Sequence, residues 1–278
     1  MQWGQFVDHD ITFTPSYLTS HGQLLDCKAC DSKKTVHPEC NPIPIPDNDP
    51  YFTPNGRPQC LHFVRSMNAQ RTLGTREQMD QLTSYLDGSN IYGSEICEAD
   101  RLRARQQGKL NSTRHPVRGH KDLLPQTPEH PECKAPSGYC FLAGDLRASE
   151  QPSLACLHTV FMREHNRIAD RLATLNPTWN DERLYQTTRK IVGAFFQQIT
   201  FREFLPRLIG NDYMDRFGLL LLPNGYYDGY DPECNAMMRN EISAAVFRLG
   251  HTLLKPSFER LDVNYRPVKK PLFLREAF

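Results

Sequence analysis

Two proline-rich stretches limit where a regular backbone can form in this chain of 278 residues. The first runs from Cys27 to Cys60 and the second from about His115 to Tyr139. Their prolines lie at positions 38, 42, 44, 46, 50, 54 and 58, and at 116, 125, 128, 131 and 136. Each proline fixes φ and removes a backbone donor, so neither stretch suits a long helix or an inner strand. We expect both stretches to be loops.

Helical periodicity marks three segments, which predict helices over residues 151–172, 181–205 and about 240–254. Apolar side chains recur there at the spacing that places them on one helical face. The apolar positions are Leu154, Leu157, Phe161, Ile168, Ala169 and Leu172; Leu184, Ile191, Val192, Phe195, Phe196 and Ile199; and Ala244, Val246, Phe247 and Leu254. We find no β alternation of useful length. The expected fold is mainly α, a single helical domain with long disulfide-tied loops.

The nine cysteines favour an oxidising compartment. Four of them crowd the first loop and two flank a turn in the second, spacings that suit local disulfides. These six are Cys27, Cys30, Cys40, Cys60, Cys133 and Cys140. A zinc site opening at Cys27-Lys-Ala-Cys30 is the alternative, but the second Cys-x-x-Cys half is missing. The remaining three, Cys97, Cys156 and Cys234, have no expected partner.

The triplet Asn-Ser-Thr at Asn111 is an acceptor for N-glycosylation and fits a secreted, extracellular protein. Secreted proteins begin with a basic and then apolar signal segment. Here Met1 leads straight into the polar and aromatic residues 2–5. We therefore expect the chain to be truncated at its N-terminal end.

Charge and hydropathy exclude several classes of protein. Lys and Arg total 33 against 32 for Asp and Glu, and neither sign forms a long run, so nothing points to nucleic acid or an anionic membrane surface. The longest apolar run, residues 217–223, falls far short of the roughly 20 residues that span a bilayer. No membrane span is expected.

The first ten residues place three polar side chains on one helical face. At about 100° per residue, His9 lies about 40° from Gln5, and Asp8 lies about 60° from Gln5 on the other side. Asp10 is turned about 140° away from Gln5. One face of this helix is suited to proton transfer, and its neighbour is suited to binding a cation. A plain hydrogen-bonded helix end is the alternative.

Two later segments carry further candidate site residues. Arg147 and Glu150 are neighbours if residues 143–150 are helical, and alone they indicate a surface ion pair worth little. His251 follows Gly250 in a helical stretch, where glycine costs about 1 kcal/mol relative to alanine. That cost suggests a group that approaches the backbone closely, either a ligand or another helix.

A calcium site is indicated by oxygen-bearing residues at every second position of one loop. In an extended loop their oxygens face one point, and Asp10 can complete the cage. The candidate ligands are Thr83, Tyr85 through its carbonyl, Asp87, Ser89 and Asp10. An EF-hand is excluded because the glycine required at the sixth loop position is absent. A simple turn over residues 87–90 is the alternative.

Four ordered motifs resemble the animal haem peroxidases of the peroxidase-cyclooxygenase superfamily, and the resemblance covers nearly the whole chain. The motifs are Trp3-Gly-Gln-Phe-Val-Asp-His-Asp10, Leu82-Thr-Ser-Tyr-Leu-Asp-Gly-Ser-Asn-Ile-Tyr-Gly93, Ala143-Gly-Asp-Leu-Arg147 and Phe247-Arg-Leu-Gly-His251. The chain stops at Phe278 in a segment that resembles the interior of the family's catalytic domain. The resemblance therefore implies a partial catalytic domain over residues 1–278, with both ends truncated.

The resemblance implies a role for each residue of the distal side of a haem. His9 resembles the acid–base that moves a proton between the two peroxide oxygens, and Arg147 the cation that stabilises the developing charge. Gln5 is expected to orient distal water. Asp8 and Glu150 match the carboxylates that form ester links to haem b. Gln151 stands where some members have a methionine bonded to haem, so no sulfonium link is expected.

The proximal side is implied in the same way. His251 resembles the histidine that binds haem iron, which requires a hydrogen-bond acceptor for its other ring nitrogen. The family's acceptor is an asparagine far downstream, which we cannot identify in this sequence. Arg248 is a candidate partner for a haem propionate, or else a solvent-facing arginine. His158 and His165 lie on one helical face and are expected to be structural.

The resemblance implies a secreted, calcium-dependent peroxidase that reduces hydrogen peroxide through an oxyferryl haem. Its electron donors are expected to be small anions, phenols, or tyrosines of extracellular-matrix proteins. Two alternatives remain open: a matrix or adhesion protein that keeps the scaffold without turnover, and an inert partial gene product. Retention of His9, Arg147 and His251 counts against lost catalysis.

Overall fold

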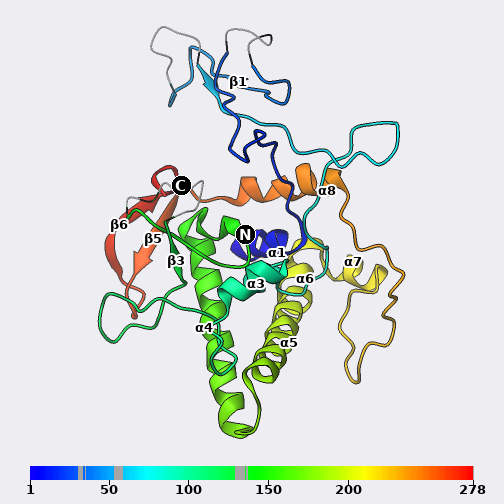
Figure 1. Cartoon of the computed structure of the whole chain (residues 1–278), viewed down its shortest axis with the longest axis vertical. Coiled ribbons are helices and arrows are strands. Elements are labelled where there is room, and N and C mark those ends of the chain that lie inside the picture. Colours follow the sequence, from blue (N-terminus) through cyan, green and yellow to red (C-terminus); the bar gives the residue numbers. More distant parts are fainter. Residues whose placement is uncertain (31–33, 35, 53–58, 129–134, 136, 278) are drawn as a thin grey trace. The chain divides into compact units, whose positions relative to one another are not determined.

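The computed structural model describes residues 1–30, 34, 36–52, 59–128, 135 and 137–277 (Figure 1). The chain separates into two compact units. The helical unit comprises Met1–Ile11 and Leu82–Phe278, and the smaller unit comprises Thr12–Gln81. A single partial domain over residues 1–278 stays a prediction.

All helices that the structure describes lie in the helical unit. They are α1 (Gln2–Ile11), α2 (Ser89–Tyr92), α3 (Ile96–Leu102), α4 (Pro152–Leu175), α5 (Asp181–Ile199), α6 (Leu205–Ile209), α7 (Asn211–Arg216) and α8 (Asn240–Ala244). The 3₁₀ helices are η1 (Leu146–Ser149), η3 (Val246–Leu253) and η4 (Leu274–Glu276), and η2 (Thr200–Phe204) is a π-helix. The predicted mainly α class is confirmed.

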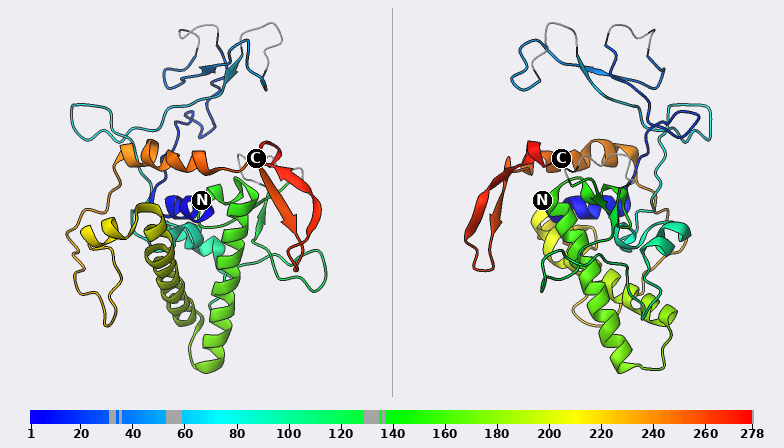
Figure 2. Two further views of the ribbon diagram at one scale, coloured as in Figure 1. Left: turned by 180° about the vertical axis from the view of Figure 1, so that it is seen from behind. Right: turned by 60° about the vertical axis from the view of Figure 1, so that its left-hand side comes forward.

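The long helices α4 and α5 form an antiparallel hairpin (Figures 1 and 2). The Gln151 side chain caps α4 by accepting a hydrogen bond from the backbone N–H of Ser153, and Pro152 occupies the first turn, where its missing N–H costs nothing. The Asn180 side chain caps α5 by accepting from the N–H of Arg183. Because only residues 176–180 connect the two helices, they lie side by side.

Aromatic rings fasten α1 to this hairpin. The Phe6 ring lies 5.2 Å from that of Phe161 on α4 and 5.6 Å from that of Phe196 on α5, between ring centroids. Trp3 lies 5.2 Å from Phe196 and donates a hydrogen bond from its indole to Thr200 Oγ1 at 3.2 Å. Phe6 and Phe196 are fully buried. Burying side chains of this size stabilises by about 1.5–3 kcal/mol each, so α1 is held firmly.

The predicted apolar stripes of α4 and α5 are largely confirmed. The buried members are Leu154, Phe161, Ile168, Ala169, Leu184, Val192 and Phe196. Phe195 is an error in the prediction, because its side chain is 44% exposed. Adjacent helical positions differ by about 100°, and Phe196 already takes the inward direction. The predicted helix over 181–205 is α-helical to Ile199 and continues as η2 and α6.

The predicted helix over residues 240–254 is only partly correct. Helix α8 ends at Ala244, Ala245 breaks the α geometry at φ −126° and ψ −59°, and η3 follows. Ala244, Val246 and Leu254 are exposed, and Phe247 alone of the predicted stripe packs partly against the core. Apolar spacing in this segment therefore did not indicate a buried face.

A β-hairpin near the C-terminal end was missed. Strand β5 (Ser257–Leu261) pairs antiparallel with β6 (Pro267–Phe273). Most residues of both strands are exposed, so no buried face imposes an alternation of apolar and polar residues. Two-residue strands also pair: β1 (Ile43–Pro44) with β2 (Cys60–Leu61), and β3 (Gln126–Thr127) with β4 (Cys140–Phe141).

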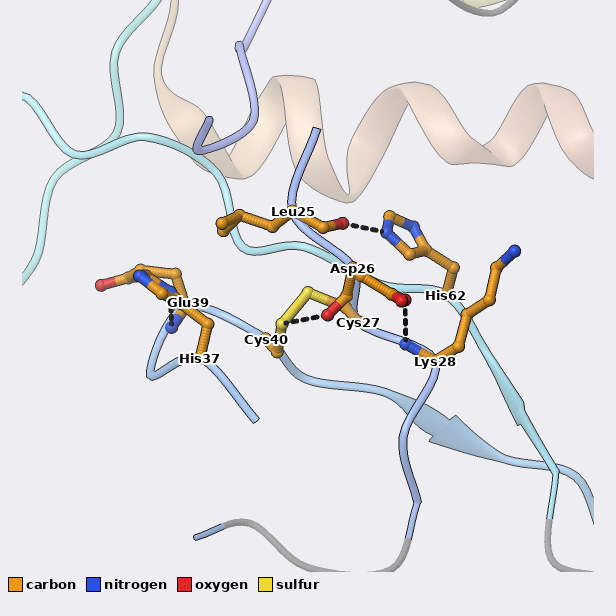
Figure 3. Close-up of a disulfide and its surroundings, with 8 residues drawn as sticks. All are labelled: Leu25, Asp26, Cys27, Lys28, His37, Glu39, Cys40 and His62. Atoms are coloured by element: carbon orange, nitrogen blue, oxygen red, sulfur yellow. Dashed lines mark hydrogen bonds between the residues drawn. A yellow bond between two sulfur atoms is a disulfide. The ribbon is translucent and has the colours of Figure 1, made fainter. Parts of the chain in front are cut away.

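The smaller unit has little regular structure and is tied by two disulfides, Cys27–Cys40 and Cys30–Cys60. Around the first, shown in Figure 3, the carbonyl oxygen of Leu25 lies 2.7 Å from Nε2 of His62. Both disulfides close the loop that was predicted to need them. All four cysteines are used, so the alternative zinc site is excluded.

The pairing predicted for the other cysteines is confirmed only in part. Cys140 is disulfide-bonded, while Cys133, its predicted partner, lies outside the described residues. Cys97, Cys156 and Cys234 are free and exposed. No helix among the described residues is long and apolar enough to cross a membrane.

His165 is buried and doubly hydrogen-bonded, as the structural role predicted for it requires. Its Nδ1 lies 2.8 Å from the Tyr92 hydroxyl and its Nε2 lies 2.8 Å from the carbonyl oxygen of Gly108. Burial lowers the pKa of His165 to about 4. The ring is therefore neutral in the folded chain at neutral pH.

We predict that His165 makes the folded chain less stable as the pH falls. Its folded pKa is depressed, so between pH 6.5 and about 4 the unfolded chain binds a proton that the folded chain refuses. Stability should fall with pH by up to about 1.4 kcal/mol per unit from this residue. Replacing His165 with Gln should flatten the slope of urea-unfolding free energy between pH 7.5 and 5.5. The same exchange at exposed His21 is the matched control, and equal slopes in wild type and His165→Gln would contradict the prediction.

Candidate active site

His9 lies on the face of α1 that also carries Gln5 and Asp8, as predicted. Its side chain is 4% exposed. Nε2 lies 3.9 Å from both Asp8 Oδ2 and Glu150 Oε2, and Nδ1 lies 3.7 Å from Asp145 Oδ1. The imidazole is thus surrounded by three carboxylates contributed by two separate parts of the sequence.

Arg147 reaches the same cluster from η1. Its Nε and Nη2 donate to Asp145 Oδ1 and Oδ2 at 2.9 and 2.7 Å, and its backbone N–H donates to Oδ1 at 2.8 Å. Nη2 also lies 3.4 Å from the carbonyl oxygen of His9. The anticipated ion pair between Arg147 and Glu150 is replaced by this bidentate pair with Asp145.

Hydrogen bonds from glutamine side chains hold Gln5 at the edge of the cluster. Gln5 donates from Nε2 to Glu150 Oε2 at 3.0 Å, and Gln151 donates from Nε2 to Gln5 Oε1 at 2.9 Å and to Gln2 Oε1 at 2.5 Å. The side-chain oxygen of Gln151 caps α4. The Gln151 side-chain amide therefore fixes Gln5 relative to that helix. Gln5 is therefore held by both Glu150 and Gln151.

Burial and charge set the protonation of the cluster. Burial, reinforced by the Arg147 charge, lowers the pKa of His9 to about 3, so the imidazole is neutral. Burial alone would raise the pKa of Asp145, but hydrogen bonds and charge from Arg147 outweigh it and hold the pKa below its usual value. Burial raises the pKa of Glu150 despite Arg147 and Gln5. The cluster holds a neutral base, a fixed cation and an ionised carboxylate.

Asp145 and Asn90 are site residues that the sequence did not reveal. Asn90 donates from Nδ2 to the Phe6 carbonyl oxygen at 2.8 Å, and its own carbonyl oxygen accepts from the Asp145 N–H at 2.9 Å. Asn90 therefore joins α1 to the segment that carries Arg147. Both residues lie inside the motifs identified in the sequence, but nothing in their spacing assigned them a role.

Asp10 lies on the other side of α1, against the predicted calcium loop. Its carboxylate accepts from the N–H groups of Gly88 and Asn90 at 3.2 and 3.1 Å and from the Ser89 hydroxyl at 3.1 Å. Burial, with a contribution from the Asp87 charge, raises the pKa of Asp10 to about 7. The structure thus places Asp10, Ser89 and Asp87 together.

The other two predicted calcium ligands, Thr83 and Tyr85, are exposed. The charge of the neighbouring Tyr230, with a hydrogen bond to it, raises the pKa of Tyr85. Within the part of the chain that the structure describes, no three His, Cys, Asp or Glu residues form a group that could hold a metal. The five-ligand calcium site stays a prediction.

His251 and Arg248 lie on η3, which packs along α1. Both side chains are exposed. Arg248 is close enough for its charge to lower the pKa values of His9 and Glu150. A Cβ built at Gly250 meets no described atom within 4 Å, so the close approach expected there is not made by another helix.

The animal haem peroxidase family model matches residues 1–278. The chain belongs to the animal haem peroxidase family. It is 38% identical over 266 residues to Heme peroxidase 2 of Caenorhabditis elegans and 42% identical over 284 residues to the Peroxidasin homolog of Mus musculus. These matches cover 95% and 96% of this chain, but only 36% and 18% of the relatives.

Solved structures agree with this membership. The fold superposes on Peroxidase A from Dictyostelium discoideum with a TM-score of 0.75 and 26% sequence identity, covering 100% of this chain and 50% of that one. This animal haem peroxidase chain therefore spans about half of that structure and 18–36% of the two relatives named above.

Gly144 should be essential to the packing of the candidate site. A Cβ at this position would lie 2.4 Å from both the Gly93 nitrogen and the Ser89 carbonyl oxygen, distances that real Cβ atoms do not tolerate. Gly144→Ala should therefore push the 143–147 segment away from residues 89–93 and lower the free energy of unfolding by about 1–3 kcal/mol.

Thermal and urea unfolding of the metal-free, haem-free chain measures this effect. Gly250→Ala is the matched control, because its added methyl group meets open space. Equal losses of stability in the two variants would show that close backbone approach at Gly144 is unimportant.

Proposed function

We propose that this protein is a haem peroxidase, in which the cluster around His9 transfers protons during reduction of hydrogen peroxide. The observation that supports this most directly is a buried, neutral imidazole beside a fixed guanidinium. General acid–base catalysis needs a group that accepts and returns a proton, and charge stabilisation needs a cation that is already in place. His9 and Arg147 meet these two needs.

The residues of the helical unit fit a haem. His9 is buried with its Nδ1 lacking a hydrogen-bond partner in the described part of the chain, whereas His251 on η3 presents an exposed imidazole. We assign His251 as the iron ligand and Arg248 as the partner of a propionate. When bound, haem iron supplies the redox chemistry that cleaves the peroxide bond and oxidises a donor.

His9 carries the proton in this proposal. Nε2 accepts it from one peroxide oxygen and returns it to the other, so no net charge accumulates on the ring. Because burial disfavours the imidazolium, the proton is held only briefly. Gln5, fixed between Glu150 and Gln151, is placed to orient water on this side.

Arg147 stabilises the negative charge that develops on the departing oxygen. Its guanidinium is held by two hydrogen bonds to Asp145, so little reorganisation is needed when charge appears. Its side chain is 22% exposed and can contact a ligand on the open side of the cluster.

Asp8 and Glu150 are proposed to form esters with haem methyl groups. One oxygen of each carboxylate lies 3.9 Å from His9 Nε2. The raised pKa of Glu150 is compatible with a carboxyl group that loses its charge on forming an ester. Gln151 has no sulfur, so a sulfonium link is excluded at that position.

We propose calcium as a second cofactor, bound near Asp10, Asp87 and Ser89. Burial raises the pKa of Asp10 and the nearby Asp87 charge adds to the shift, so a hard divalent ion would relieve both burial and repulsion. Thr83 and the Tyr85 carbonyl are the other two proposed ligands. Since Asp10 adjoins His9, calcium would then stabilise α1.

The cysteine chemistry supports a secreted, extracellular location, because disulfides persist in oxidising compartments. Small anions, phenols and tyrosines of matrix proteins are the proposed electron donors.

A glycan at Asn111 would disturb hydrogen bonds that the folded chain makes. The Asn111 Nδ2 donates to the carbonyl oxygens of Arg101 and Arg103, both at 3.0 Å. A glycan on this nitrogen would break at least one of these bonds.

The roles of the two histidines are separable by mutation. His9→Ala should leave haem retention largely intact but slow the reaction with peroxide by roughly 10²–10⁴, the range for general acid–base residues. His251→Ala should instead reduce haem retention, because it removes the iron ligand. Soret absorbance per mole measures retention, and stopped-flow absorbance after mixing with peroxide measures the rate.

His21→Ala is the control for both measurements, since His21 is exposed in the smaller unit. Wild-type peroxide kinetics in His9→Ala would refute the proton-transfer role. Undiminished haem retention in His251→Ala would refute the ligand role.

Calcium should stabilise the full chain at pH 7.5. A site-bound ion at 100 times its dissociation constant adds about 2.7 kcal/mol, so the unfolding midpoint should rise with calcium and little with magnesium. Asp87→Asn should abolish the rise, while Asp215→Asn, an exposed change on α7, should retain it. A calcium response that survives Asp87→Asn would show that the ion binds elsewhere.

A further inference from the structure

The carboxylate of Asp145 binds Arg147 and lies close to the imidazole of His9. The Asp145 side chain is 5% exposed and accepts from three N–H groups of Arg147: the backbone amide, Nε and Nη2. Nε is shared between the two carboxylate oxygens, at 2.9 Å from Oδ1 and 3.2 Å from Oδ2. In the described part of the chain, Nδ1 of His9 is a buried nitrogen without a partner, and it lies 3.7 Å from Oδ1 of Asp145.

The tautomer of His9 depends on this contact. A neutral imidazole carries one proton, on either Nδ1 or Nε2, and the other nitrogen presents a lone pair. With the proton on Nδ1, the N–H points towards an ionised carboxylate. With the proton on Nε2, the Nδ1 lone pair faces that negative charge and stays unsatisfied in a buried site, which is costly.

We propose that Asp145 is a positioning residue, whose carboxylate accepts a hydrogen bond from Nδ1–H of His9 while it holds Arg147. The Nε2 lone pair is thereby directed to the side of the ring that faces Asp8 and Glu150. The importance of this tautomer for peroxide chemistry rests on the proposed function, whereas the tautomer itself does not.

The backbone keeps Asp145 in place for both partners. Its N–H donates to the Asn90 carbonyl oxygen at 2.9 Å, and its side chain caps η1. Gly144, just before it, packs against residues 89–93 with no room for a Cβ. Closing the remaining gap to Nδ1 therefore requires a small rotation of the His9 ring rather than movement of Asp145.

Asp8 and Glu150 favour the opposite tautomer, since each lies 3.9 Å from Nε2. Both are more exposed than Asp145, with side chains 18% and 42% accessible against 5%, so water screens their charges more strongly. Glu150 Oε2 also accepts from Gln5 at 3.0 Å. Asp145 is nearer to the His9 ring, more buried and kept ionised by Arg147. Its effect on the His9 tautomer is therefore larger than that of Asp8 and Glu150.

Histidine nitrogen NMR on the haem-free full chain tests the proposal directly. Long-range proton–nitrogen correlations distinguish a protonated Nδ1 from a protonated Nε2, and loss of one ring signal set in His9→Gln assigns the resonances. We expect wild-type His9 to carry its proton on Nδ1. In Asp145→Asn the ratio of Nδ1–H to Nε2–H should fall about threefold or more, because a charge-assisted bond is replaced by a neutral one. Asp215→Asn should leave the ratio unchanged.

Each outcome decides the proposal. A wild-type His9 protonated on Nε2 overturns it, whether or not Asp145→Asn folds, and so does an unchanged ratio in a folded Asp145→Asn chain. If the wild-type tautomer is Nδ1–H but the haem-loaded chain does not react with peroxide, the proposed function fails and the positioning role stands. If the haem-loaded chain reacts but His9 is protonated on Nε2, the positioning role fails and the proposed function stands.

Discussion

The carboxylate of Asp10 is buried inside the helical unit, where a polar group must be hydrogen-bonded or neutralised. It accepts three hydrogen bonds from residues 88–90, and these bonds fasten that loop to α1. Asn90 in turn donates to the carbonyl oxygen of Phe6 and accepts from the N–H of Asp145. Asp145 then holds Arg147 beside His9. A single chain of contacts thus connects the side of α1 proposed to bind calcium with the side proposed to transfer protons.

Two buried aspartates show how the environment decides the charge of a side chain. Burial raises the pKa of Asp10 to about 7, because its donors are neutral and Asp87 adds a like charge. Asp145 is similarly enclosed, but the guanidinium of Arg147 outweighs the cost of burial and lowers its pKa. The first site would gain from a cation, whereas the second already contains one. This difference supports different roles for the two carboxylates.

Local patterns predicted the parts of the structure that depend on local physics. Proline spacing located the loops, and the helical stripes located α4 and α5, because the helical period is set by backbone geometry alone. Spacing within α1 also placed Gln5, Asp8 and His9 on one face. Prediction failed at 240–254 and 257–273, where most side chains are exposed and no buried face shapes the pattern. It also failed at Phe195, since two adjacent phenylalanines cannot both face the core.

By itself, the sequence determined the mainly α class, the cysteine-rich loop, the family motifs and the residue types available for catalysis. Only the tertiary structure decided which of these side chains meet. Asp145 is two residues from Arg147 and far from His9 in sequence, and its proposed role depends on a close backbone approach that requires glycine at position 144. The pairing of Arg147 with Asp145 rather than Glu150 has the same origin. Such contacts depend on how α1, the 88–93 loop and η1 pack, and packing between distant segments leaves no periodic signal in the sequence.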